Sequence, residues 1–141
     1  MRRVVVVGAV LAGVVAIAGA ITVVVQRRAA AQEMRDRRAA LAVGRQFLAD
    51  WPAKRYEHMT ALAAAGDDPG TSYRALDRRL MTTTVEVVPG VLAKDGRHLP
   101  FTVHLQLKGF GRLDWQTALE LTRAPDGWRV LFRSDAVYPG L

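Results

Sequence analysis

Apolar and polar positions change their spacing along this chain, and each change predicts a different element. An apolar run without a charged residue extends from Val4 to Val25. Good helix formers dominate residues 29–51, and apolar residues recur there on one helical face, at Ala40, Val43, Phe47 and Trp51. After Met81 the apolar period falls from about 3.6 to 2, which is the period of a half-buried strand. The pattern predicts helices first and a β-sheet afterwards.

Two shorter helices are predicted between Trp51 and Met81. Pro52 is expected to end or redirect the first helix. One short apolar stripe follows at Tyr56, Met59 and Ala63, and another at Tyr73, Leu76 and Leu80. The sequence of residues 66–70, GDDPG, is typical of a turn, with Asp68 before Pro69 as a helix cap.

Four strands are predicted in the second half of the chain. Val85 and Val87 alternate around Glu86 in the first. The cleanest alternation follows at Leu99, Phe101, Val103, Leu105 and Leu107. The third strand holds Trp115, Thr117, Leu119 and Leu121, and the fourth holds Trp128, Val130 and Phe132. Turn sequences at residues 93–96, 109–111 and 124–127 separate them. The fold class is therefore α+β: three helices cover the apolar face of a curved antiparallel sheet whose other face is in water.

The run from Val4 to Val25 is long enough to be a single membrane-spanning helix, at about 33 Å. Ala18-Gly19-Ala20 would suit a signal-peptide cleavage site, but the apolar run continues beyond it, which favours an uncleaved anchor. The expected organisation is an anchor in residues 1–25, a basic stalk in residues 26–38 and a folded domain in residues 39–141. The expected contacts of the stalk are anionic lipid headgroups or cell-wall polymers, because arginines cluster there, at Arg27, Arg28, Arg35, Arg37 and Arg38.

Composition narrows the chemistry further. The 141 residues contain no cysteine, which excludes disulfides, thiolate zinc sites and thiol nucleophiles. The net charge is +7, yet nucleic acid is not an expected partner, because Asp77 lies among Arg74, Arg78 and Arg79 and no aromatic-basic motif is present.

No catalytic, cofactor-binding or metal-binding residue is predicted. His58, His98 and His104 lack ligand-like spacing and are expected to be exposed. Asp67 and Asp68 suggest a turn and a cap more than a cation site. The apolar sheet face has Thr117 as its one polar member, with His104 and Glu120 on the opposite parity. The tryptophans are expected in the core, at Trp51, Trp115 and Trp128.

Several segments together resemble a known family. Residues 47–51 (FLADW), residues 85–90 (VEVVPG) and the close through Gly127-Trp128-Arg129-Val130 to Tyr138-Pro139-Gly140-Leu141 carry the resemblance. They are similar to the nuclear-transport-factor-2-like N-terminal domain of class B penicillin-binding proteins of the methicillin-resistance type, in its actinobacterial form. The resemblance extends over roughly residues 39–141. The last strand departs from the family, because it lacks a second tryptophan and the Ser-Pro-Ser that usually follows.

The resemblance implies a cone-like, non-catalytic module that is associated with the response to β-lactams. It would hold a peptidoglycan transpeptidase domain, in cis or in trans, outside a cell membrane that the chain crosses once. The chain lacks the transpeptidase motifs S-x-x-K, S-D-N and K-T-G. For the first of them, Ser72 and Ser134 are followed three positions on by Ala75 and Val137 and not by lysine. The alternatives are a small-molecule-binding or lyase/isomerase-like protein of the same fold, or a membrane-anchored accessory protein of a lipid transporter.

Overall fold

The computed structural model describes the backbone of residues 2–134 and the side chains of residues 19–134. It divides into two compact units, Met1–Asp36 and Arg37–Leu141, which helix α1 (Arg2–Asp50) joins without interruption. Two further helices follow, α2 (Tyr56–Leu62) and α3 (Pro69–Leu80). The strands are β1 (Thr82–Pro89), β2 (His98–Leu107), β3 (Gly111–Ala124) and β4 (Gly127–Leu131).

The first unit is helical from Arg2 onward. Within the part of the chain whose side chains are described, no helix has the length and apolarity that crossing a membrane requires. Most of the predicted anchor, residues 4–18, lies outside that part. Its last residues are described, and Ile21 and Val23 to Val25 are exposed there.

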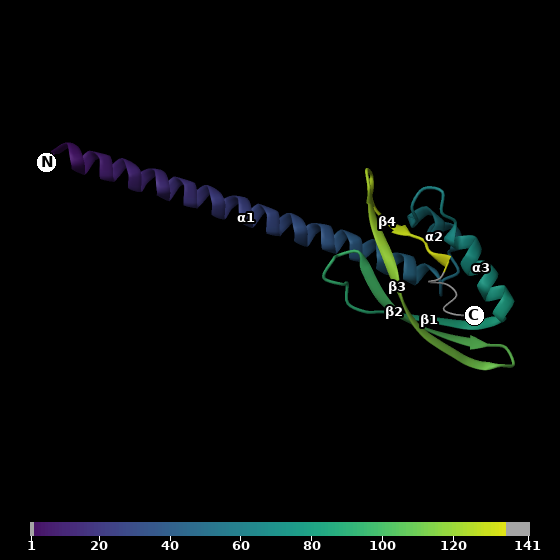
Figure 1. Ribbon diagram of the computed structural model, residues 1–141. Coiled ribbons are helices and arrows are strands. Elements are labelled where there is room, and N and C mark those ends of the chain that lie inside the picture. The colour runs from purple at the N-terminus through teal and green to yellow at the C-terminus, as the bar shows by residue number, and fades with distance from the viewer. Residues whose placement is uncertain (1, 135–141) are drawn as a thin grey trace. The chain divides into compact units, whose positions relative to one another are not determined.

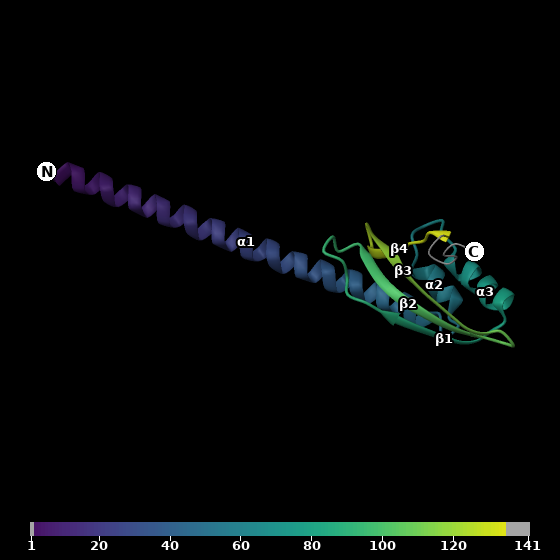
Figure 2. The same cartoon turned by 60° about the horizontal axis from the view of Figure 1, so that its bottom comes forward.

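The second unit has the predicted α+β architecture. Its four strands form one antiparallel sheet in the order β1-β2-β3-β4. Figures 1 and 2 show α2, α3 and the last turns of α1 on one side of this curved sheet. The register places Val103 of β2 between Val87 of β1 and Trp115 of β3, so alternate residues of all three strands share a face. The predicted period of two is confirmed.

The core lies between this face and the helices. The sheet contributes Leu99, Phe101, Val103, Leu105, Leu119, Leu121 and Val130, all buried. The helical side contributes Ala40, Phe47, Leu48, Trp51, Tyr56, Met59, Tyr73 and Leu76. Helix α1 approaches the sheet closely at Gly44, where an added Cβ would lie 2.8 Å from Leu99 Cδ2. A glycine at this position therefore sets the distance between helix and sheet.

The helix boundaries agree with the expected signals, with one correction. Helix α1 ends at Asp50, just before Pro52. Residues 66–70 are not one turn, because α3 already begins at Pro69 and Gly70 belongs to its first turn. Asp68 is the N-cap and accepts a hydrogen bond from the Thr71 amide at 3.2 Å. A proline at the start of a helix loses nothing, since its missing N–H would have no partner in the helix.

Candidate functional site

A cleft of about 450 Å³ lies between α2, α3 and the start of β1. The turn after α1 contributes Pro52 and Lys54, and α2 contributes Tyr56. The floor and far wall are formed by Arg74, Asp77, Arg78, Thr82, Thr83, Thr84 and Val85. Because β1 is an edge strand of the sheet, one wall of the cleft is a strand without a neighbour on that side within the described sheet.

Asp77 organises the inner end of the cleft. Its carboxylate accepts hydrogen bonds from Trp51 Nε1, at 3.1 and 3.2 Å, and from the hydroxyl of Tyr56. Burial of the phenol and its hydrogen bond to Asp77 raise the pKa of Tyr56 well above 10.0. Tyr56 therefore stays protonated and donating at any physiological pH. This cluster ties α1, α2 and α3 together at one point.

Three cations surround this cluster. The Arg74 guanidinium lies 5.2 Å from the centre of the Tyr56 ring and forms an ion pair with Glu57, which is exposed. Lys54 and Arg78 also line the cleft. Lys54 adopts a left-handed conformation, with φ of 57°, which residues other than glycine rarely do.

A second carboxylate, Asp50, is fully buried at the end of α1. It accepts hydrogen bonds from Gln46 Nε2 at 2.8 Å and from His58 Nδ1, and Arg55 Nε lies 3.1 Å away. His58 is half exposed, as expected for its side chain, but this buried partner orients its ring. Without its three partners the buried charge of Asp50 would be costly, so the cluster stabilises the turn from α1 to α2.

Both carboxylates lie on buried helical stripes, a signal that the sequence interpretation overlooked. Asp50 is three residues after Phe47, and Asp77 is four residues after Tyr73. Residues at these spacings share a helix face, so each aspartate had to point toward the core. The apolar face of the sheet has the predicted composition, with Thr117 half-buried, and the printed partners of both aspartates lie in the helical layer.

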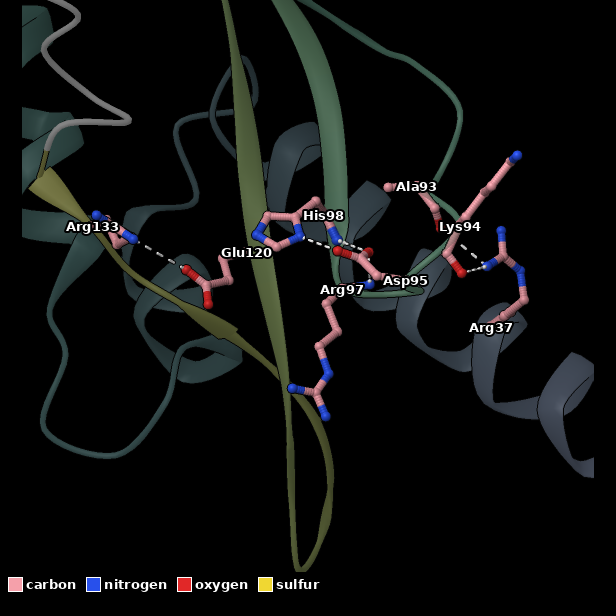
Figure 3. A network of polar contacts seen from close by, with 8 residues as sticks. All are labelled: Arg37, Ala93, Lys94, Asp95, Arg97, His98, Glu120 and Arg133. Carbon is pink, nitrogen blue, oxygen red and sulfur yellow. Dashed lines mark hydrogen bonds and ion pairs between the residues drawn. The ribbon is translucent and has the colours of Figure 1, made fainter.

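A third polar network surrounds the loop between β1 and β2 (Figure 3). The Arg37 guanidinium donates to the carbonyl oxygens of Ala93 at 3.0 Å, Lys94 at 3.3 Å and Leu92 at 3.3 Å. Asp95 Oδ1 accepts from the backbone amides of Arg97 and His98. The bond from the Arg97 amide and then the bond with the His98 side chain hold the pKa of Asp95 below its usual range. The contacts of Arg37 and Asp95 serve the loop itself, and the ion pair between Glu120 and Arg133 in the same view joins β3 to the segment after β4, so we assign the network to stability.

The remaining histidines also pair with aspartates. His98 is exposed and lies 2.6 Å from Asp95 Oδ2, as Figure 3 shows. His104 is half-buried, contrary to the expected full exposure, because Asp114 on the neighbouring strand binds its Nδ1 at 2.7 Å. Asp67 Oδ2 accepts from the Phe132 amide at 3.2 Å. Across the described residues, no three or more potential ligand side chains gather around a possible metal position.

The tryptophans lie in or against the core, as predicted. Trp51 is buried, and its ring packs at a tilt against Tyr73, with centroids 4.6 Å apart, and against Trp115, at 6.2 Å. Trp115 and Trp128 are partly buried against the same cluster. Core packing therefore accounts for the three rings without a stacking ligand.

Comparison with known proteins does not identify this chain. No protein-family model matches it, and no curated protein matches it either. The fold and the contacts described above are therefore the basis for interpreting its function.

Proposed function

We propose that this chain is the membrane-anchored, non-catalytic N-terminal module of a class B penicillin-binding protein of the methicillin-resistance type. Its role would be to place a peptidoglycan transpeptidase domain at a distance from the membrane and to contact other proteins of cell-wall synthesis. The association with the β-lactam response belongs to this proposal. The assignment to this family rests on the residues that resemble it, and the α+β architecture supports the assignment.

One observation carries the proposal furthest. The inner face of the sheet is filled by side chains that pack on α1, α2 and α3, including Leu99, Val103, Leu105 and Leu121, all nearly inaccessible to solvent. Superfamily members that bind ligands inside the cone need space there. A closed, well-packed interior suits a spacer that must be rigid, and leaves the outer surfaces for contacts with partners.

The anchor is the second part of the proposal. Helix α1 continues from Arg2 to Asp50, so the apolar run and the part of the helix that packs in the core belong to one element. We propose that Val4 to Val25 spans the cell membrane and that the folded domain is extracytoplasmic. Fractionation after carbonate washing and protease accessibility in spheroplasts test the location and the orientation.

The decisive experiment is to read the coding sequence beyond Leu141 and to measure the mass of the membrane-extracted product. A reading frame that continues into a linker and a domain with S-x-x-K supports the spacer role in cis. If a stop codon follows, a photo-crosslinking residue at exposed Val91 should capture a division or elongation synthase. Repeated failure to recover such an enzyme, with no downstream transpeptidase, would contradict the proposal.

A further inference from the structure

The cleft between α2, α3 and β1 is lined by more cations than carboxylates, and contacts within the described fold do not neutralise the excess. Three cations line it, Lys54, Arg74 and Arg78, against the single carboxylate of Asp77. Both oxygens of that carboxylate already accept hydrogen bonds from Trp51 and Tyr56. The wall of the cleft therefore presents an excess of positive charge.

Two of the cations have no protein partner in the described part of the chain. The side chains of Lys54 and Arg78 form no ion pair or hydrogen bond there. The third, Arg74, pairs with Glu57, whose side chain is 80% exposed and surrounded by water. Such an exposed ion pair contributes little and exchanges readily with another anion.

The wall also contains a hydroxyl that lacks a partner. Thr82 lines the cleft, and its Oγ1 is buried with no hydrogen-bond partner among the described residues. Buried polar atoms nearly always have a partner, so this hydroxyl is an exception in the wall of the cleft, and a ligand would reach it only if its neighbours moved.

Backbone geometry fixes two sides of the cleft. Within the described residues, the left-handed positions other than glycine are Lys54 and Met81. Both follow the end of a helix: the Met81 amide donates to the carbonyl oxygens of Asp77 and Arg78, and the Lys54 amide donates to that of Trp51. These turns place Lys54 and the neighbouring Thr82 at the cleft.

We propose that this cleft binds an oxyanion, namely a phosphate or carboxylate group carried by a small ligand or by a lipid headgroup. Lys54, Arg74 and Arg78 supply the charge-assisted hydrogen bonds, and exposed Thr84 near the start of β1 supplies a neutral donor. A volume of about 450 Å³ is within the range of small-molecule sites. The inference is independent of the proposed role in cell-wall synthesis.

Isothermal titration of the full chain in a non-ionic detergent tests the site, at a fixed ionic strength of about 0.15 M so that nonspecific attraction is screened. The soluble probes are pyrophosphate and citrate, and the lipid probes are mixed micelles of the same detergent and phosphatidylcholine, with or without phosphatidylglycerol. Saturable binding of either soluble anion indicates a free ligand. Binding that requires phosphatidylglycerol indicates a lipid headgroup.

The double variant Lys54→Asn with Arg78→Gln should weaken this binding about tenfold or more, because it removes two charged donors. Asparagine tolerates the left-handed conformation at position 54, so the turn is retained. Arg78→Gln alone and Arg79→Gln form the matched pair: each removes one charge from the same helical turn, but Arg79 does not line the cleft, and its variant should change affinity less than twofold. Circular dichroism confirms that each variant is folded.

Three results would overturn the proposal. They are the absence of saturable binding by any probe, an unchanged affinity in the folded double variant, and equal weakening by Arg78→Gln and Arg79→Gln, which would indicate only general attraction to a basic protein.

Discussion

At the scale of single residues, the two aromatic hydroxyls of the helical layer are held in their neutral form. Tyr73 is 1% exposed, and its burial raises its pKa above the ordinary value of 10.0. The pKa of Tyr56 is also raised, by burial and by its hydrogen bond to Asp77. A raised pKa in the folded state means that the folded protein keeps a proton that the unfolded chain releases, so stability is lost as pH rises above 10.

Tyr73→Phe should remove one such contribution. In the wild type the free energy of unfolding should fall by about 1 kcal/mol for this residue between pH 9 and pH 11. The free energy of unfolding of the variant should fall by about 1 kcal/mol less over the same pH range. At pH 7 the two proteins should have nearly the same free energy of unfolding. Urea unfolding at the three pH values measures both. An equal fall in both proteins would show that Tyr73 ionises as easily in the folded state as in the unfolded state.

At the scale of elements, two helices approach their neighbours closely at glycines. Gly70 in α3 lies against the start of α2, where an added Cβ would be 2.1 Å from the Tyr56 carbonyl oxygen. Gly44 in α1 faces Leu99 Cδ2 instead, the end of a side chain that can rotate.

Gly70→Ala should therefore destabilise the protein by about 2–3 kcal/mol, because backbone must move to relieve the overlap. Gly44→Ala should change stability by about 1 kcal/mol or less, since the gain in helix propensity offsets a small shift of Leu99. Thermal and urea unfolding of both variants make the comparison. Equal losses at the two sites would contradict the distinction between backbone and side-chain contact.

Arg37 is the contact through which α1 holds the loop between β1 and β2. Removing its three hydrogen bonds by Arg37→Ala should speed amide exchange at Ala93 and Gly96, whose backbone bonds shape the loop, by about five- to tenfold. Arg38→Ala, at the next and exposed position, is the control and should leave exchange in the loop unchanged. Hydrogen exchange read by mass spectrometry covers this loop in one peptide.

At the scale of the whole molecule, the second unit contains a complete core. All of its buried residues, from Ala40 to Val130, lie within Arg37–Leu141. Residues 37–141 alone should therefore unfold in one cooperative thermal transition, with a midpoint close to that of the full chain.

A chain that begins at residue 49 is the matched control for this truncation. It loses Ala40, Phe47 and Leu48 from the core and should not fold, because the inner face of the sheet would be exposed. Circular dichroism melting distinguishes the two. A broad, non-cooperative transition for residues 37–141 would show that the first unit contributes to the stability of the second.

Local spacing in the sequence was enough to predict the helices, the strands and their buried faces. The stripe at Tyr73 and Leu76 and the alternation from Leu99 to Leu105 each follow from the geometry of one element, and the structure buries all of these side chains. Hydrophobic burial acts on each element in the same direction, whatever its neighbours are.

Only the tertiary structure decided which polar groups meet. Asp77 accepts hydrogen bonds from Trp51 and Tyr56, and Arg37 donates to carbonyl groups more than fifty positions away in the sequence. These contacts depend on the packing distance and relative rotation of separate elements, which no local period encodes. The cleft and its excess of cations arise in the same way, because its lining comes from the turn after α1, from α2 and α3, and from β1 at the edge of the described sheet.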